Sequence, residues 1–279
     1  MSRFIEKRVV VTGGGSGLGR ALALHYSGHG WRVLIGDIDP ASAQETADAI
    51  VATGGTALAC ACDVREESTL AAMARLAEDR WNGFDIWINN AGVANAGEIT
   101  DLSIDQWRWI TDVNLLGCVR GARVAIPVLR RQRAGHLINV ASFAGLANPA
   151  GLAAYNASKA AVISLSETLR LELAGDGIGV SVACPSFFAT RLLETSDSLA
   201  PPQSSEPRPP HMRQLAHRLM SQSPISASDV AAHLYEGLLR ERFMLIAHPR
   251  AHFLWRLKRW FPELCFRLAR RNAARPRAY

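Results

Sequence analysis

A tyrosine and a lysine that stand four residues apart, Tyr155 and Lys159, are the residues of this sequence best suited to proton transfer. On a helix, positions i and i+4 share one face, so the lysine ammonium would lie beside the phenol. A nearby positive charge favours the tyrosinate and lowers a phenol pKa that begins near ~10, toward the range useful for proton transfer at neutral pH. Ser142 follows an apolar run and could hydrogen-bond a substrate oxygen. A Tyr-x-x-x-Lys pair alone is a common coincidence, so these residues need further support.

Support comes from a glycine-rich segment near the N-terminus, Thr12-Gly13-Gly14-Gly15-Ser16-Gly17-Leu18-Gly19. It joins an apolar run typical of a buried strand to an amphipathic run typical of a helix. Glycines let the backbone approach a pyrophosphate closely, and a helix N-terminus offers unpaired N–H groups and the positive end of its dipole. We therefore predict that this segment binds the phosphates of a dinucleotide. The residues expected to contact the dinucleotide are Gly13, Gly15, Ser16, Gly17, Leu18 and Gly19.

An acidic residue ends the second predicted strand, 24 residues after Gly13. A carboxylate there, Asp37, can accept hydrogen bonds from the ribose of the adenosine, and its charge would repel a 2′-phosphate. No Arg or Lys occurs within residues 13–19, and Ile38 stands where a phosphate-binding arginine could have been. A helix cap is the alternative role, but Asp39 already supplies one before Pro40. The sequence therefore favours NAD over NADP as the cofactor.

Short apolar runs rich in β-branched residues alternate with longer amphipathic segments along most of the chain. The predicted strands are residues 9–11, 33–36, 56–62, 84–89, 136–141, 179–184 and 243–247. The predicted helices are residues 18–26, one that opens at Asp39-Pro40, 66–80, 103–133 with an interruption at Pro127, 152–174 and 227–240. Such alternation favours a parallel sheet covered on both faces by helices. We therefore predict an α/β fold with a doubly wound, Rossmann-type, mostly parallel seven-stranded sheet, plus a C-terminal helical extension.

A proline-rich stretch interrupts this alternation. Five prolines fall between residues 199 and 212, which could mark a linker between two domains. A predicted helix and strand resume the pattern after it, so we favour a loop or lid over the substrate, residues 199–225, within a single domain. The predicted organisation is one catalytic domain over residues 1–249 and a basic amphipathic extension over residues 250–279.

Taken together, these motifs make the sequence similar to the short-chain dehydrogenase/reductase family in its single-domain form. The resemblance covers roughly residues 5–247. Its motifs are Thr12-Gly13-x-x-x-Gly17-x-Gly19, Asp63-Val64, Asn89-Asn90-Ala91-Gly92, Asn114, Ser142 and Tyr155-x-x-x-Lys159. The resemblance implies an NAD(P)-dependent oxidoreductase that transfers a hydride between a nicotinamide and a carbonyl or alcohol carbon.

The resemblance also implies a role for each matching residue. Tyr155 would exchange the proton with the substrate oxygen, and Ser142 would position that oxygen. Lys159 would tune Tyr155 and hold the nicotinamide ribose, while Asn114 would support a water that connects Lys159 to solvent. Asp63 and Val64 would flank the adenine. The cofactor channel would be lined by Asn90, Ala91, Gly92 and Pro185, and Thr190 would reach the nicotinamide carboxamide.

One departure from the family pattern concerns the segment after the sixth predicted strand. The family usually has Pro-Gly there, whereas this chain has Pro185-Ser186, followed by Phe187 and Phe188. With Phe143, these aromatic residues could form an apolar wall of the substrate pocket, or they could serve ordinary packing. The first alternative would suit a lipid-like alcohol or carbonyl compound.

The positive charge of the chain is concentrated in its C-terminal part. Residues 240–279 hold eleven Lys/Arg and two acidic residues, while the preceding residues carry a net charge of −3. Apolar residues between 253 and 268 fall on one arc at helical spacing, basic residues lie mostly opposite, and Pro262 favours two short helices. Residues 250–271 could rest on an anionic membrane as a peripheral contact, or pack on the body or on a partner subunit. No recognition motif accompanies the charge, so nucleic acid is not an expected partner.

Other classes of protein are not supported. The five cysteines lack zinc-site or C-x-x-C spacing and are expected to be reduced thiols, and no metal is expected because the His pairs lack a third ligand. No signal peptide or membrane-spanning segment is evident, so we expect a cytoplasmic protein. Peripheral contact with a membrane is the alternative that the C-terminal segment leaves open. The resemblance implies a homodimer or homotetramer. The rival functions are a non-catalytic NAD(P)-sensing protein and a membrane-peripheral scaffold on the same fold.

Overall fold

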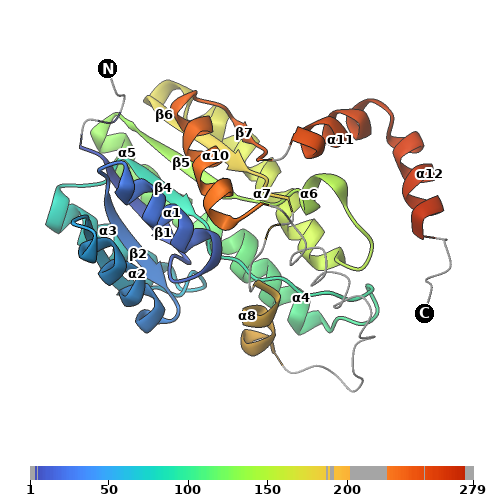
Figure 1. Ribbon diagram of the computed structural model, residues 1–279, viewed down its shortest axis with the longest axis horizontal. Helices are drawn as coiled ribbons and strands as arrows, with labels where there is room; N and C mark the ends of the chain where they lie inside the picture. Colours follow the sequence, from blue (N-terminus) through green and yellow to red (C-terminus); the bar gives the residue numbers. More distant parts are fainter. Residues whose placement is uncertain are drawn as a thin grey trace.

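Seven strands build the central sheet of the molecule, in the order β3-β2-β1-β4-β5-β6-β7 (Figure 1). The structure is a computed structural model that describes residues 4, 6–186, 188, 192–201, 225–247 and 249–273. The strands are β1 (Arg8–Thr12), β2 (Arg32–Asp37), β3 (Thr56–Ala61), β4 (Ile86–Asn89), β5 (Gly135–Val140), β6 (Ile178–Ala183) and β7 (Met244–Leu245). Each neighbouring pair is parallel, which confirms the doubly wound sheet predicted from the alternation of apolar runs.

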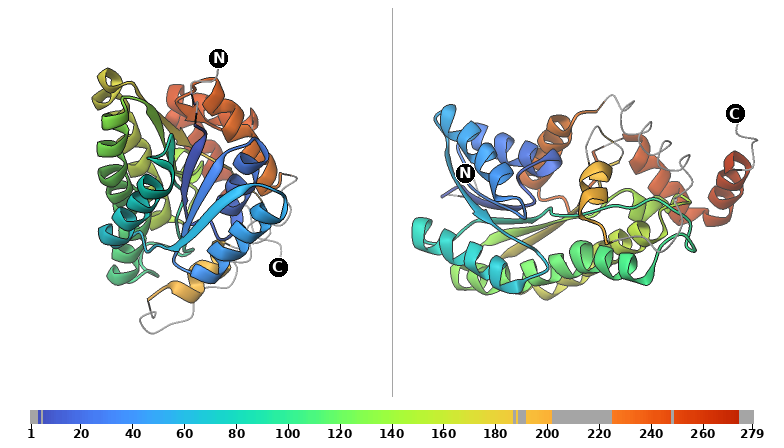
Figure 2. Two further views of the ribbon diagram at one scale, coloured as in Figure 1. Left: turned by 90° about the vertical axis from the view of Figure 1, so that its left-hand side faces the viewer. Right: turned by 90° about the horizontal axis from the view of Figure 1, so that it is seen from below.

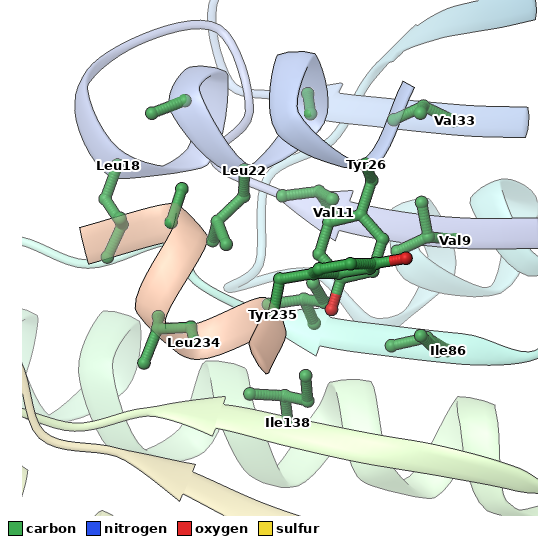
Figure 3. Close-up of a cluster of buried hydrophobic side chains, with 14 of the residues drawn as sticks. Val9, Val11, Leu18, Leu22, Tyr26, Val33, Ile86, Ile138, Leu234 and Tyr235 are labelled. Carbon is green, nitrogen blue, oxygen red and sulfur yellow. The ribbon is translucent and has the colours of Figure 1, made fainter. Parts of the chain in front are cut away.

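Helices cover both faces of the sheet, as the two views of Figure 2 show. One layer contains α1 (Gly17–Gly28), α2 (Pro40–Ala52) and α10 (Ala227–Leu239), and the other contains α3 (Glu67–Trp81), α5 (Gly117–Gln132) and α7 (Ala153–Glu172). Side chains alternate between the faces of a strand, so Val9 and Val11 join the first core while Val10 joins the second. Figure 3 shows the first core, where Tyr26 of α1 meets Tyr235 of α10 edge to face. Two dry cores thus hold the sheet rigid beneath its carboxyl edge.

The strand order reverses between β1 and β4. The chain runs outward from β1 through β2 to β3, then returns to place β4 on the other side of β1. The loops that follow β1 and β4 consequently diverge at the carboxyl edge of the sheet. Open α/β sheets bind ligands in the crevice at this kind of switch point.

A buried hydrogen-bonded chain connects the strands next to the switch point. The Trp87 indole N–H donates to Asn89 Oδ1 at 2.7 Å, and Asn89 Nδ2 donates to Asn139 Oδ1 at 2.8 Å. Asn139 Nδ2 in turn donates to Ser166 Oγ of α7 at 3.0 Å. Because every member has a partner, burying these polar groups costs little, and the chain fixes β4, β5 and α7 relative to one another.

The predicted helix over residues 103–133 is interrupted at a different place from the one expected. The chain forms α4 (Ile104–Thr111), a π-helical turn η1 (Asp112–Leu116) and then α5, which continues through Pro127. A proline inside a helix removes one i→i−4 hydrogen bond. Here that loss does not end the helix, which runs without a break from Gly117 to Gln132. The change of winding lies instead at η1, which contains Asn114, and π-helical turns recur at functional sites.

The C-terminal extension consists of two helices, α11 (Pro249–Trp260) and α12 (Pro262–Ala273), which meet at Phe261 as the position of Pro262 predicted. Ala251 and Trp255 of α11 pack on a cluster formed by β6, α5 and α7. In Figure 1 and in the right view of Figure 2, α12 stands apart from the sheet and its covering helices. The extension therefore joins the body through α11.

The proline-rich loop predicted over residues 199–225 lies outside the described residues, except for residues 199–201 and 225. Before it, the short helix α8 (Leu192–Leu199) belongs to the described part of the chain. Within the residues that the structure describes, no helix is both long and apolar enough to span a bilayer.

Candidate active site

The glycine-rich loop between β1 and α1 lies directly against the chain that follows β4. Gly13 adopts φ +63°, and a Cβ there would lie 2.7 Å from Ala91 Cα. A Cβ on Gly19 would collide with the Gly13 carbonyl oxygen. Both positions therefore require glycine, because any side chain would push the two backbones apart. The loop is held in place by Asn90, whose Nδ2 donates to the carbonyl oxygens of Thr12 at 2.9 Å and Gly13 at 3.0 Å.

The N-terminus of α1 has the character of an anion site. Ser16 occupies the N-cap position without a side-chain capping hydrogen bond, so the first backbone N–H groups of the helix are not engaged by that side chain. Such N–H groups, with the positive end of the helix dipole, bind phosphates. Together with the glycine cradle, this arrangement fits the pyrophosphate of a dinucleotide.

Asp37 lies at the end of β2 beside this loop. The Gly15 N–H donates to its Oδ2 at 2.8 Å, and the Asp39 N–H donates to its Oδ1 at 3.1 Å. The carboxylate is half-buried and lines the same cavity as the loop. The alternative role as a helix cap belongs to Asp39, whose side chain accepts from the Ala41 N–H at 3.1 Å. Asp37 is thus left as an acceptor at the wall of the cavity.

An ion pair forms the adjoining wall. Arg65 binds both carboxylate oxygens of Asp63, with the closest contact at 2.6 Å from its Nη2. These hydrogen bonds hold the pKa of Asp63 below its usual value, against the opposing effect of burial. Arg65 could not be singled out from the sequence, since nothing distinguishes one surface arginine before its partner is known. Among the described lining residues, the two basic side chains are Arg65, paired with Asp63, and Lys159.

Ser142, Tyr155 and Lys159 converge on one side of the cavity, from the end of β5 and the first turns of α7. The Ser142 side chain is hydrogen-bonded to Tyr155. Lys159 Nζ lies 5.8 Å from the centroid of the Tyr155 ring and donates to the Val140 carbonyl oxygen at 2.8 Å. The i, i+4 spacing therefore does place the ammonium group beside the phenol, as expected from the sequence.

The pKa values of this pair differ from the expectation. Burial raises the pKa of Tyr155, and the hydrogen bond with Ser142 opposes this effect only in part. Burial likewise lowers the pKa of Lys159. The prediction that Lys159 would lower the phenol pKa was wrong for the protein alone, because removal from water disfavours the charged form of both groups. The phenol consequently keeps its proton at neutral pH.

Asn114 is fully buried behind the catalytic side chains and does not line the cavity. Its Nδ2 donates to the Val93 carbonyl oxygen at 2.9 Å and to Ser158 Oγ at 3.0 Å, while its Oδ1 accepts from the Val93 N–H at 2.8 Å. It thereby ties the chain after β4 to the second turn of α7. A Cβ on Gly92 would lie 3.2 Å from Asn114 Oδ1 and 3.3 Å from Lys159 Nζ, so only glycine leaves these two polar groups undisturbed.

The whole cavity has a volume of about 510 Å³, and the rest of its lining consists mainly of apolar side chains. Phe143 and Phe188 line it as predicted, whereas Phe187 and Thr190 lie outside the described residues. Apolar lining residues that sequence reasoning missed are Val93, Ala94, Trp109, Val113, Ala147, Pro149, Leu152, Leu192 and Leu199. Their pattern in the sequence is that of ordinary core residues, so no signal distinguished them.

A buried serine fastens α8 over this apolar part. Ser196 Oγ accepts from the Ala94 N–H at 2.8 Å and donates to the Leu192 carbonyl oxygen at 2.5 Å. Ser196 is 1% exposed, so its hydroxyl has no access to water. The contact holds Leu192 at the wall of the cavity.

Most of the predicted site residues thus surround a single cavity. Those that line it are Gly13, Ser16, Gly17, Leu18, Gly19, Asp37, Asp63, Val64, Asn90, Ala91, Gly92, Ser142, Phe143, Tyr155, Lys159, Pro185 and Phe188. Gly15 and Asn114 lie behind the wall and act through Asp37 and Ser158. Within the described part of the chain, no group of three His, Cys, Asp or Glu side chains could hold a metal ion.

Comparisons with known proteins agree with this geometry. A family model described as short chain dehydrogenase matches residues 7–199. The probable oxidoreductase EphD of Mycobacterium tuberculosis is 32% identical over 261 residues, which are 93% of this chain and 44% of that protein. The CLA biosynthesis dehydrogenase/reductase of Lactiplantibacillus plantarum is 30% identical, with 89% of this chain and 90% of that protein covered.

A solved structure resembles nearly the whole chain. It is a short-chain dehydrogenase/reductase from Burkholderia phymatum in complex with NAD, 33% identical, with a TM-score of 0.88 and coverage of 95% of this chain and 96% of that chain. The likeness therefore extends beyond the residues that the family model matches. In contrast, this chain spans less than half the length of EphD, so what EphD does as a whole protein is not transferred to it.

Proposed function

Because this chain belongs to the short-chain dehydrogenase family, we propose that it is an NAD-dependent oxidoreductase that interconverts an apolar alcohol and its aldehyde or ketone. One observation carries the proposal: Ser142, Tyr155 and Lys159 line the same cavity as the glycine-rich loop and Asp37. A proton donor, a hydrogen-bond donor and a cation thus face the space beside a dinucleotide site.

The proposed reaction divides the work between cofactor and protein. When bound, the nicotinamide supplies the hydride for carbonyl reduction or accepts it in alcohol oxidation. In reduction, the Tyr155 phenol gives its proton to the substrate oxygen, so that hydride and proton together convert C=O into CH–OH. The Ser142 hydroxyl donates a hydrogen bond to the same oxygen and holds it near Tyr155. The Lys159 ammonium stabilises the tyrosinate that results.

The surroundings of Tyr155 suit the direction of reduction at neutral pH. Burial raises the phenol pKa, so the acid form that reduction needs is the one present. Oxidation requires the tyrosinate and is favoured by alkaline conditions. Asn114 and Ser158 act as positioning residues, because they fix the first turn of α7 from which Tyr155 projects.

The preference for NAD rests on Asp37. Its carboxylate is available to the adenosine ribose, and the nearest lining arginine, Arg65, is engaged with Asp63. A 2′-phosphate would meet an uncompensated negative charge. The related Burkholderia structure was obtained with NAD, which is in keeping with this choice.

The preference for an apolar substrate rests on the lining of the cavity beyond Tyr155. This part of the cavity is lined by Phe143, Phe188 and the further apolar side chains named above. Among the described residues, the charged side chain there is Lys159. A small polar substrate would gain little from such walls, whereas an aliphatic chain would bury its surface. One relative is described as a CLA biosynthesis dehydrogenase/reductase, in line with a lipid-like substrate.

A cofactor-sensing protein without turnover is less well supported. Such a protein would be expected to lack one of the proposed catalytic side chains, whereas Ser142, Tyr155 and Lys159 are all present at the cavity. We further propose a homodimer or homotetramer, which the family resemblance suggests, and a cytoplasmic location, because no signal peptide is evident in this sequence.

A panel of alcohols and aldehydes tests the proposed function. Straight-chain aldehydes of increasing length, assayed with NADH and with NADPH, are expected to show kcat/KM rising with chain length and higher values with NADH. Each methylene buried in the cavity contributes about 0.8 kcal/mol, or roughly a fourfold rise in kcat/KM, until the cavity is filled. Higher kcat/KM for small hydroxy acids or sugars than for aliphatic chains would contradict the apolar assignment.

A further inference from the structure

Helix α11 has apolar side chains on two opposite faces. Ala251 and Trp255 face the body, where they pack on the cluster formed by β6, α5 and α7. Phe253, Leu257 and Trp260, at spacing i, i+4 and i+7, lie on the opposite face. Phe253 is 65% exposed and Trp260 is 78% exposed. Packing on the body therefore accounts for one apolar face and leaves the other turned to solvent.

Helix α12, which follows directly, has an exposed apolar stripe of its own. Phe261, Leu264 and Leu268, at spacing i, i+3 and i+7, form an apolar stripe, and each is about half exposed. Arg267, three residues after Leu264, flanks this stripe, while Arg270 lies on the other side of the helix near Phe266, and all three are exposed. Figure 1 shows α12 projecting from the end of α11 without the support of the sheet. A helix with an uncovered apolar stripe and a basic face is typical of a segment that lies in a membrane interface.

The charge of these helices selects the kind of surface that would cover them. Residues 249–273 contain seven Lys/Arg and one acidic residue, Glu263, whereas the chain before residue 240 carries a net negative charge. Pairing with the same stripe of a second copy would cover the apolar side chains but would supply no counter-charge for the seven basic side chains. An anionic lipid surface instead attracts the basic side chains while its acyl boundary takes up the apolar ones.

We propose that the stripe formed by Phe253, Leu257, Trp260, Phe261, Leu264 and Leu268 docks onto the surface of an anionic lipid bilayer. The negative body is repelled by the same surface, so docking orients the molecule with its C-terminal helices toward the lipid. Docking of this kind needs no membrane-spanning helix, because the stripe would enter only the headgroup and upper acyl region of the bilayer.

The docking helices are connected to the wall of the active-site cavity. Lys258 Nζ of α11 donates to the Leu146 carbonyl oxygen of α6 (Ala144–Ala147) at 2.6 Å. Ala144 and Ala147 of the same short helix line the cavity. Docking would therefore bring the substrate side of the cavity near the lipid, where an apolar substrate partitions. This step alone rests on the proposed function; vesicle binding itself does not.

Vesicle co-sedimentation of the full chain tests the proposal without cofactor or substrate. We expect the protein to sediment with phosphatidylcholine vesicles that contain phosphatidylglycerol, and to remain in solution with phosphatidylcholine alone. Binding should weaken as salt is raised, because screening shortens the reach of surface charges. Absence of binding to the phosphatidylglycerol vesicles at low salt would overturn the proposal.

Two variants separate the contributions of charge and apolar contact. Replacing Arg267→Gln and Arg270→Gln should weaken the partition coefficient about 30-fold, because each basic residue near an anionic surface contributes about fivefold. Replacing Leu264→Gln and Leu268→Gln should weaken it at least about 10-fold through lost burial. The matched control is Arg75→Gln with Arg80→Gln, which removes the same charge from exposed positions of α3 and should bind as the unaltered chain does.

Sedimentation velocity of the same variants tests whether a second copy of the chain, rather than lipid, covers the stripe. If Leu264→Gln with Leu268→Gln dissociates an oligomer while vesicle binding is absent, the stripe is an interface between copies and the proposal is wrong. Equal loss of binding in the Arg75/Arg80 control would also overturn it, since net charge rather than this surface would then be responsible. Reduction of a short water-soluble aldehyde, measured in parallel without vesicles, reports on the proposed function separately and should be unchanged in these variants.

Discussion

Removing the charge of Asp37 while keeping its hydrogen-bond acceptor should shift cofactor preference toward NADP. Asp37→Asn retains an oxygen for the Gly15 N–H, which donates to Oδ2 at 2.8 Å, so the loop should keep its path. The negative charge at the cavity wall is lost, together with the longer hydrogen bond from the Asp39 N–H at 3.1 Å, because the amide NH2 cannot accept it. The variant therefore tests mainly the electrostatic part of the discrimination.

The size of the effect follows from the position of Asp37. Two unit charges about 4 Å apart interact by ~4 kcal/mol at the effective dielectric of a protein surface and by ~1 kcal/mol in water. Asp37 is half-buried, so we expect about 2 kcal/mol between its carboxylate and a 2′-phosphate, or roughly a 30-fold gain in kcat/KM for NADPH. Loss of a charge-assisted hydrogen bond to the ribose should lower kcat/KM for NADH by about 1 kcal/mol, roughly fivefold. The ratio of the two should thus move by on the order of 100-fold.

Steady-state kcat/KM values for NADH and NADPH with one aldehyde measure this ratio. The matched control is Asp39→Asn, which removes the same charge two residues away and preserves the N-cap of α2, because asparagine is an equally good capping residue. The control should leave the ratio within about threefold of that of the unaltered enzyme. A ratio that is unchanged in Asp37→Asn, or that changes equally in Asp39→Asn, would refute the reasoning.

Three further predictions concern the catalytic half of the cavity. Because burial raises the pKa of Tyr155, alcohol oxidation should accelerate with rising pH through the alkaline range, while carbonyl reduction should fall only once the phenol itself ionises; a pH–rate profile in each direction checks this. Ser196→Ala should leave the buried Ala94 N–H without an acceptor and lower the free energy of unfolding by about 1–3 kcal/mol, as urea denaturation would report. Gly92→Ala would place a Cβ 3.3 Å from Lys159 Nζ and should lower kcat roughly 10-fold or more with an unchanged circular dichroism spectrum.

The sequence was informative where a chemical requirement confines residues to a local pattern. Gly13 and Gly19 could be identified because the turn after β1 has no room for a side chain, and Tyr155 with Lys159 because helix geometry brings i and i+4 together. The parallel sheet with helices on both faces followed from the alternation of strand and helix. Such local rules operate within a few residues and need no knowledge of distant contacts.

Other features depend on contacts between distant parts of the chain. Trp109 lines the cavity only because α4 packs against α7, and in the sequence it is indistinguishable from a core residue. The raised pKa of Tyr155 depends on how completely neighbouring elements exclude water, and the nearby lysine was therefore a misleading guide. Pro127 was expected to interrupt the helix over residues 103–133, yet the helix continues through it and the winding changes at η1 instead.

The replacement of one oxygen atom tests the central claim, that Tyr155 is the proton donor and acceptor of the reaction. Tyr155→Phe keeps the ring that lines the cavity and removes the hydroxyl that is hydrogen-bonded to Ser142. Turnover of an aliphatic aldehyde with NADH should fall by about 10²–10⁴-fold, because general acid catalysis contributes that much. NADH affinity, measured by fluorescence titration, should change less than about threefold, since the phenol proton is not needed to bind the dinucleotide. Turnover close to that of the unaltered enzyme would contradict the account.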